Sequence, residues 1–576
     1  MKRTALLALA LAATALAFLP GPEQAETKWL LPGLEPPALD AESSHTWDAR
    51  FYRIDLDLPM TDGSMNARCG VWLTSRVPAL DTVTFNFTRL VCDSVKRGGQ
   101  HLDFYDSYLY LDVYLDSPLA EGDSTWLDIW YHRSSSTQNR GFYYYLKGSG
   151  SNRNHSVCYS MTEPEDARYW FPCWDEPWDK AEQGVQVNIT VPDSFQACAN
   201  GLLDSVTTGG GRKTHWWTHR YPVPTYLVNF NASRFAFIEQ HALASATDSI
   251  PVYNYVWPED SAAAVNSFSK VPDMIEFYSR PDRFGDYPFL EEKYGHVAVY
   301  PFSFGGMEHQ TMTTVHRQWV TNGSESGIAH ELGHMWYGDF VTCHDWREIW
   351  LNEGGASYLD PLWMHHYYGR GRFLQDMDDY AQYFFQADQQ DRHPIYNPGL
   401  ARLFDYGHTY CKAAWVNHML RYVEKDTAFD APGTWWETER AWLDSFAYGT
   451  STTEDRKRIH ELHTGLELDW FFDEWVFHAG FPDYTVNWFN RETTDGWELV
   501  VDVGQDNGSL APGCFRMPVE LMVTVNGTDT LLRWDIARNP QRDVFSMPGQ
   551  VTGVVFDPGK WLLHKQSITS GIENEL

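Results

Sequence analysis

Residues 330–334 read His-Glu-Leu-Gly-His. On a helix, positions i and i+4 share a face, so His330 and His334 can reach one metal ion while Glu331 stays beside it. A catalytic zinc ion takes three protein ligands and leaves one position for water. Glu353, in the run Trp-Leu-Asn-Glu-Gly-Gly over 350–355, is the candidate third ligand on an expected next helix. The sequence predicts one zinc ion per chain, held by His330, His334 and Glu353.

This ligand set predicts hydrolysis. Zinc lowers the pKa of its water from about 16 to about 7, so hydroxide becomes available at neutral pH. Glu331 is expected to accept a proton as the water attacks a carbonyl, and then to pass it to the leaving amine. A further donor is needed for the developing oxyanion. The alternative interpretation of the motif is a pair of surface histidines on an acidic protein.

The elements that must position these residues change in character along the chain. Residues from about 45 to 245 alternate apolar and polar side chains with period two, as in 51–58 and 185–191, which predicts an all-β region. From 257 to about 478 the pattern is mostly helical, with a short β segment at 296–300 before a Gly-Gly turn. The helical stretches expected are 261–278, 324–340, 354–368, 373–388, 409–424 and 453–465.

Strand signals return after residue 480, at 484–487, 497–503, 519–525 and 551–556, which suits a small β-sandwich. The residues from Gln566 onward are expected to form a loose tail. The fold class predicted is therefore a multidomain α+β protein. Its parts are a signal segment at 1–25, an N-terminal β domain at 40–245, a zinc catalytic domain at 250–478 and a β-sandwich at 480–565.

In combination, several motifs resemble the M1 family of zinc aminopeptidases, which includes leukotriene A4 hydrolase and aminopeptidase N. The resemblance rests on the spacing from the histidine motif to Glu353 and on Ile-Trp-Leu-Asn-Glu-Gly at 349–354. It rests also on Phe-Gly-Gly-Met-Glu-His at 304–309, Tyr-Cys-Lys-Ala at 410–413 and the block at 161–177. It implies a thermolysin-like, mostly helical catalytic domain and an aminopeptidase activity.

The resemblance also implies roles for individual residues. Tyr410 is the expected oxyanion donor, although Tyr406 and His408 lie close enough in sequence to compete. Glu308 and Glu163 are expected to bind the free α-ammonium of a peptide, and Glu165 could take the place of Glu163. Backbone exposed by glycine could pair with an extended peptide, so the substrate-binding residues predicted are Glu163, Gly305, Gly306, Met307 and Glu308.

The sequence departs from the family pattern in three places. His309 stands where the family usually has Asn, which could change the local pH dependence. Ala413 replaces the usual Gly, which is expected to matter little. Many family members carry a large C-terminal helical domain over the cleft, and none follows the sandwich here. The active site is therefore expected to be more open, or to be closed by oligomerisation.

Other residues near the motifs leave alternatives open. Asp339 and Asp345 could orient the zinc histidines or cap helices. Cys343 and Cys411 are expected to be buried thiols or a disulfide rather than ligands.

Composition limits the class of partner. The formal net charge is −33 at pH 7, which disfavours nucleic acid. Lys2 and Arg3 precede an apolar run over 5–18, which predicts a secretory signal and a secreted or periplasmic protein. A retained N-terminal anchor is the alternative, but no stable membrane insertion is expected after signal removal. The sequence leaves the oligomeric state open.

The function predicted is cleavage of the N-terminal bond of peptides that have a free N-terminal amine. One alternative is a zinc-bearing peptide-binding protein without turnover. Another is a zinc hydrolase with endopeptidase or epoxide hydrolase activity.

Overall fold

The computed structural model describes residues 45–135, 139–148, 154–429 and 433–571. The predicted signal segment at 1–25 lies outside these residues. The chain divides into two compact units, one ending at Trp346 with Phe446–Thr450 added, and one formed by Arg347–Ser445 and the residues from Ser451. No helix among the described residues is long and apolar enough to cross a membrane.

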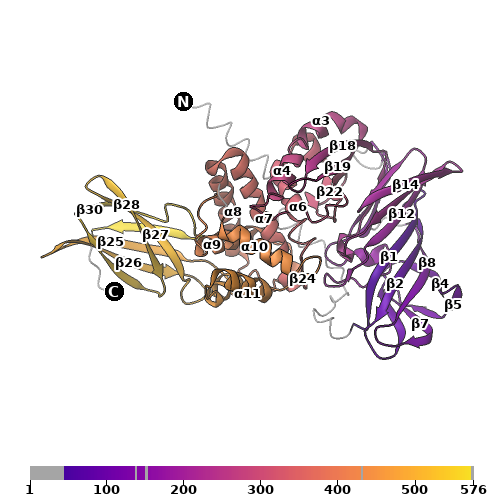
Figure 1. Cartoon of the computed structure of the whole chain (residues 1–576), viewed down its shortest axis with the longest axis horizontal. Helices are drawn as coiled ribbons and strands as arrows, with labels where there is room; N and C mark the ends of the chain where they lie inside the picture. Colours follow the sequence, from indigo (N-terminus) through magenta and orange to yellow (C-terminus); the bar gives the residue numbers. More distant parts are fainter. Residues whose placement is uncertain (1–44, 136–138, 149–153, 430–432, 572–576) are drawn as a thin grey trace. The chain divides into compact units, whose positions relative to one another are not determined.

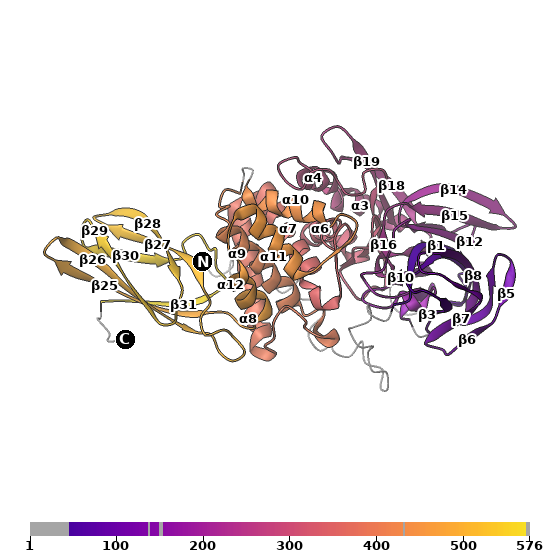
Figure 2. The ribbon, with the colours of Figure 1, turned by 60° about the horizontal axis from the view of Figure 1, so that its bottom comes forward.

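An eight-stranded sheet dominates the N-terminal part of the first unit (Figures 1 and 2). Central strand β1 buries alternate side chains, pairs antiparallel with β2 and parallel with β12, and so matches the period-two pattern of its sequence. In spatial order the strands are β14 (Leu202–Gly209), β15 (Arg212–His219), β12 (Val185–Pro192), β1 (Trp47–Asp57), β2 (Met65–Ser75), β8 (Ser124–Arg133), β4 (Val91–Arg97) and β5 (Gln100–Leu102).

Three smaller sheets complete this all-β part. The four-stranded sheet carries β10, whose five residues are all buried. Its order is β13 (Gln196–Ala199), β17 (Phe230–Ser233), β10 (Val157–Met161) and β9 (Gly141–Tyr145). The others are β3 (Leu80–Asn86), β7 (Tyr110–Leu119) and β6 (Phe104–Asp106), and the pair β11 (Lys180–Ala181) and β16 (Val223–Pro224).

A five-stranded mixed sheet follows in the first unit. Its middle strand β20 is fully buried and runs parallel to both neighbours, as expected of a strand covered on both faces. The order is β18 (Ala236–Leu243), β19 (Ser249–Val256), β20 (Tyr294–Val299), β22 (Thr313–His316) and β21 (Gly306–Met307). Strand β18 pairs with β19, so one sheet holds residues from both sides of the domain boundary expected at 245–250.

Helices of the first unit are shorter than the sequence pattern suggested. The stretch expected as one helix over 261–278 is two helices, α3 (Ser261–Ser267) and α4 (Val271–Tyr278). Pro272 lies in the first turn of α4, where its missing N–H costs nothing, whereas inside a continuous helix it would break a hydrogen bond. Helix α5 is Arg317–Asn322. Helix α6 (Glu325–Gly333) ends well before residue 340, and Gly338 has a φ of 120° in the turn that follows.

The helices of the second unit pack as a bundle (Figure 1). They are α7 (Trp350–Tyr368), α8 (Arg370–Gln390), α9 (Ala413–Val423), α10 (Thr434–Ser445), α11 (Thr453–Thr464) and α12 (Asp469–Phe472), with π-helical segments η7 (Tyr406–Lys412) and η8 (Asp473–Phe477). A Cβ at Gly354 of α7 would lie 2.5 Å from Cβ of Ala413. The close approach of α7 to residue 413 therefore depends on Gly354, which explains how Ala is tolerated at 413.

The C-terminal strands form two sheets (Figure 2). Their facing sides meet through ring contacts such as Tyr484 with Phe556, with centroids 5.0 Å apart. One sheet is β29 (Gln541–Met547), β26 (Gly496–Asp506), β25 (Asp483–Thr493) and β31 (Lys565–Ser570); the other is β28 (Thr528–Ile536), β27 (Met517–Val525) and β30 (Val551–Phe556). The expected loose tail is wrong, because β31 pairs in parallel with β25 over six residues. The predicted fold class is confirmed.

Candidate metal centre and peptide site

The two histidines at the end of helix α6 bring their Nε2 atoms close together. His330 lies in the last turn, and His334 is the C-cap with helical backbone angles. Their Nε2 atoms are 3.1 Å apart, and the rings stand at 89°. Two ligands of one tetrahedral zinc ion at about 2.0–2.1 Å would have nitrogens about 3.3 Å apart. The spacing therefore fits two lone pairs that share a cation.

A backbone carbonyl sets the tautomer of His334. Its Nδ1 is 2.9 Å from the carbonyl oxygen of Tyr337, so Nδ1 carries the hydrogen and Nε2 keeps its lone pair. Sequence reasoning offered Asp339 and Asp345 for this role and missed Tyr337, because any residue type supplies a carbonyl. Asp339 is buried, and burial followed by the nearby Glu308 raises its carboxyl pKa well above the ordinary value.

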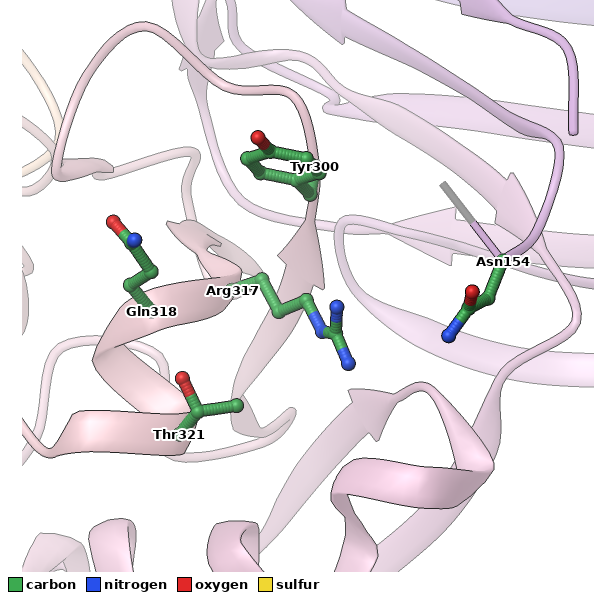
Figure 3. A pocket seen from close by; sticks show the side chains of 5 residues that line it. All are labelled: Asn154, Tyr300, Arg317, Gln318 and Thr321. Atoms are coloured by element: carbon green, nitrogen blue, oxygen red, sulfur yellow. The ribbon is translucent and has the colours of Figure 1, made fainter. Parts of the chain in front are cut away.

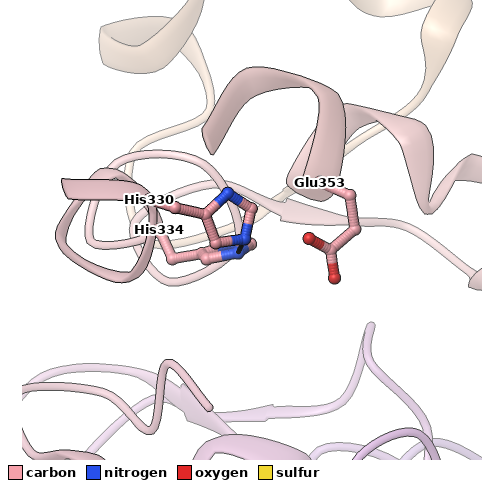
Figure 4. A group of neighbouring side chains, drawn as sticks. All are labelled: His330, His334 and Glu353. Carbon is pink, nitrogen blue, oxygen red and sulfur yellow. Dashed lines mark hydrogen bonds between the residues drawn. The ribbon is translucent and has the colours of Figure 1, made fainter. Parts of the chain in front are cut away.

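Glu353 lies in the first turn of α7, where the hydroxyl of Tyr410 donates to its Oε1 at 3.0 Å. One ligand atom from each of His330, His334 and Glu353 lies within 4.8 Å of the other two (Figure 4). Two imidazoles and one carboxylate form a donor set typical of catalytic zinc. The three predicted ligands are thus brought together, and their chemistry fits that ion.

Glu331 points from the same helix toward strand β21, which is the edge of its sheet. An ideal Cβ on Gly306 would lie 2.1 Å from Oε1 of Glu331, so only glycine fits beside that carboxylate. Gly305 has a different neighbour, since its Cβ would lie 2.3 Å from the indole of Trp319. Both glycines therefore serve close packing, and β21 offers an edge at which a peptide could pair.

Two further carboxylates gather next to this strand. Glu308 follows the buried Met307, and Glu163 follows strand β10; they are 3% and 5% exposed. One oxygen of each lies within 4.8 Å of the other, and Oε1 of Glu308 is 3.8 Å from Nδ1 of His334. Glu165 instead contacts the guanidinium of Arg168 at 3.3 Å.

The three candidates for the oxyanion donor, Tyr406, His408 and Tyr410, all lie in segment η7 but make different contacts. Tyr406 packs against the rings of Tyr380 and Tyr383. His408 lies 2.9 Å from the carboxylate of Asp405. Tyr410 is the one that reaches Glu353. The helical stretch expected over 409–424 consists of the end of this π-helix followed by α9.

A second group of possible ligands lies in the second unit. Atoms of His393, Asp405 and His408 lie within 4.8 Å of one another, but the two rings stack with centroids 3.9 Å apart, so their lone pairs do not converge. Burial lowers the pKa of His408, yet hydrogen bonds to the carboxylates of Asp388 and Asp405 outweigh burial and raise the pKa overall. The stacking of the two rings therefore argues against a shared metal ion at this group.

Other predicted residues and a surface pocket lie apart from this chemistry. Cys343 and Cys411 are buried thiols and do not form a disulfide. A pocket in the first unit is lined by Asn154, Tyr300, Arg317, Gln318 and Thr321 (Figure 3). The guanidinium of Arg317 is already held by both carboxylate oxygens of Asp260, so its charge is balanced. The pocket includes no predicted site residue.

Two models of known protein domains match the chain. A model of the peptidase M1 N-terminal domain matches residues 49–227, and one of the peptidase family M1 domain matches residues 266–475. Together they cover more than half of the sequence. The chain belongs to peptidase family M1.

Individual relatives are more distant. The chain is 26% identical over 436 residues to aminopeptidase M1-C of Oryza sativa subsp. japonica, covering 72% of this chain and 47% of that protein. It is 24% identical over 508 residues to human aminopeptidase N, covering 80% and 48%. It thus spans about half the length of these relatives. A crystal structure of an M1 zinc metallopeptidase from Deinococcus radiodurans shares the fold, with a TM-score of 0.64 and 23% identity over 75% of this chain and 94% of that one.

Proposed function

We propose that this chain is a zinc metalloaminopeptidase that hydrolyses the N-terminal peptide bond of peptides. The observation that carries the proposal is the facing pair of Nε2 atoms in His330 and His334, 3.1 Å apart, with the carboxylate of Glu331 on the same helix. Glu353 supplies the third ligand. A related crystal structure is of an M1 zinc metallopeptidase mutant from Deinococcus radiodurans bound to a Tyr-Ser-Ala substrate, which supports peptides as the substrate class.

A bound zinc ion supplies Lewis acidity that polarises a carbonyl and lowers the pKa of water to about 7. Glu331 accepts a proton from the attacking water at its carboxylate and delivers it to the leaving nitrogen. Tyr410 turns its hydroxyl from Glu353 to the carbonyl oxygen as negative charge develops there. The carboxylates of Glu163 and Glu308 bind the α-ammonium, which fixes cleavage at the first bond.

The Glu331→Gln variant tests the mechanism. It should keep its zinc but lose about 10²–10⁴-fold in kcat on aminoacyl amides, since Gln cannot accept the proton. Glu325→Gln is the matched control, because Glu325 starts the same helix and pairs instead with Lys270 at 2.7 Å. Wild-type activity in Glu331→Gln, or a wild-type protein that binds no zinc, would refute the proposal.

The register of cleavage has its own test. Nα-acetylated peptides should resist hydrolysis because the acetyl group removes the cation that Glu163 and Glu308 bind. Free and acetylated forms of one peptide, compared by mass spectrometry of the products, separate the two classes. Rapid internal cleavage of the acetylated form would indicate an endopeptidase.

We propose also that the protein is exported. The basic Lys2 and Arg3 followed by the apolar run over 5–18 support a secretory signal. N-terminal sequencing of the native protein should find a start after residue 17 or 25. A full-length chain in the membrane fraction would instead indicate a retained anchor.

A further inference from the structure

His309 lies between the two segments that carry the proposed ammonium-binding carboxylates. It follows Glu308 directly, and its side chain is fully buried. Its Nε2 is 3.5 Å from Oγ1 of Thr162, the residue before Glu163. Its Nδ1 is 3.0 Å from Oγ1 of Thr314 on strand β22. One imidazole thus connects the Glu163 segment, the Glu308 segment and the sheet.

The direction of these hydrogen bonds is determined by a neighbour. The hydroxyl of Thr162 donates to the carbonyl oxygen of Tyr226, so its oxygen is left to accept from Nε2–H of His309. The hydroxyl of Thr314 then donates to Nδ1. A single neutral tautomer satisfies the whole chain of bonds.

Burial keeps this imidazole neutral. It lowers the pKa of His309 to about 3, so the ring carries no charge at working pH. Two carboxylates this close repel each other, and a cationic brace between them would compete with the substrate ammonium. A neutral imidazole can restrain the segments that carry the two carboxylates without competing for the substrate ammonium.

The segment after His309 is fixed independently. Asn200 donates to the carbonyl of Gln310 at 2.7 Å, and Asn229 donates to that of Met312 at 2.9 Å. The buried side-chain nitrogen of Lys293 donates to the carbonyl of Thr311 at 2.7 Å. These hydrogen bonds hold residues 310–312 in place. The hydrogen bond from His309 then restrains Thr162 and, through it, the adjacent Glu163.

We propose that His309 is a positioning residue that sets the separation of Glu163 and Glu308, so that both carboxylates bind one α-ammonium. The inference rests on the proposed function and deepens it. It predicts that loss of His309 weakens recognition of the amine and leaves metal binding intact.

Two inhibitors of nearly equal shape test this directly. Leucine hydroxamate and 4-methylpentanoyl hydroxamate both chelate zinc, but only the first carries an α-amine. The ratio of Ki for 4-methylpentanoyl hydroxamate to Ki for leucine hydroxamate measures how much the amine contributes to binding. In His309→Ala this ratio should fall by about ten-fold or more, while Ki of the amine-free compound stays within about three-fold of wild type. Zinc content should be unchanged.

Three variants serve as controls. His296→Ala removes another fully buried, neutral histidine, whose Nδ1 bonds Asn254 at 2.9 Å in the same sheet, and should keep the wild-type ratio. His309→Asn should recover part of the ratio, because an amide can also donate and accept, and should leave the pH profile of kcat/KM unchanged. Thr314→Val removes the donor to Nδ1 with little change in volume, and replaces His309→Ala if that variant fails to fold.

The outcomes separate the two proposals. A wild-type ratio near one means that the amine is not recognised, and the proposed function fails. A large wild-type ratio that persists in folded, zinc-loaded His309→Ala or Thr314→Val overturns the role of His309. Equal weakening of both inhibitors also overturns it, because the defect then lies at the metal. An acidic limb that shifts in His309→Asn would show that His309 titrates, contrary to the neutral brace.

Discussion

Replacement of Gly306 by Ala tests how tightly the carboxylate of Glu331 is confined. The new Cβ would lie 2.1 Å from Oε1, and ordinary van der Waals contact begins at 3.4 Å. The carboxylate must therefore move by about 1.3 Å. The obstructing atom is the end of a side chain rather than backbone, so the protein should still fold.

A displacement of about 1 Å of a catalytic group can lower the rate about 10²-fold. We therefore expect kcat to fall about 100-fold, equivalent to about 2.7 kcal/mol of activation free energy. KM and zinc content should change little, because the three atoms nearest to the new methyl group all belong to Glu331. Steady-state kinetics on an aminoacyl amide, with metal analysis of the same sample, measure all three quantities.

Two other glycines provide the contrast. Gly305→Ala places its Cβ 2.3 Å from the indole of Trp319, a rigid ring, and should lower the free energy of unfolding by about 1–3 kcal/mol. Gly371→Ala in α8 meets no atom within 4 Å and should stabilise the helix by about 0.5–1 kcal/mol with wild-type kinetics. Wild-type kcat in Gly306→Ala would refute either the confinement of Glu331 or its role as the base.

Three further predictions follow from the same structure. Tyr410→Phe should lower kcat by about 10²–10³-fold with little change in KM, as judged by steady-state kinetics, since the oxyanion loses one donor. A chelator should abolish hydrolysis and lower the melting temperature, and added Zn²⁺ should restore both. Burial opposes protonation of His460, but Glu424 and Glu439 outweigh it and raise its pKa to about 9. Because this pKa exceeds the unfolded value of about 6.5, the stabilisation is full below pH 6.5 and is lost as pH rises through about 9. Urea unfolding should show this fall in wild type and a flatter profile in His460→Gln.

The clustering of the three proposed metal ligands could be predicted because it depends on residue type and on spacing along the sequence. His330 and His334 need only the i, i+4 spacing of a helix to share an ion, and Glu353 lies in the first turn of the helix that follows. The alternation of β1 and β12 likewise predicted strands. These features depend on local geometry, which sequence periodicity records directly.

Other features depend on contacts that leave no such record. The carbonyl of Tyr337 orients His334, yet any residue type would provide it. The π-helical turn before Ala413 has the composition of an α-helix. The tail from Gln566 is polar and short, and only pairing with β25 makes it a strand. In each case the missing information was a backbone contact or a backbone geometry that residue type does not record.

The contacts described for the four site carboxylates follow one physical logic. Glu331 is confined by the missing side chain of Gly306, and Glu353 accepts from the neutral hydroxyl of Tyr410. Glu163 and Glu308 lie on segments joined by the neutral imidazole of His309. In each pair, position is fixed by shape or by an uncharged hydrogen bond. A cation in place of any of these neutral groups would compete for the carboxylate oxygens that the proposed zinc ion and ammonium would use. His309 is the neutral group at which this argument can be tested without touching a carboxylate.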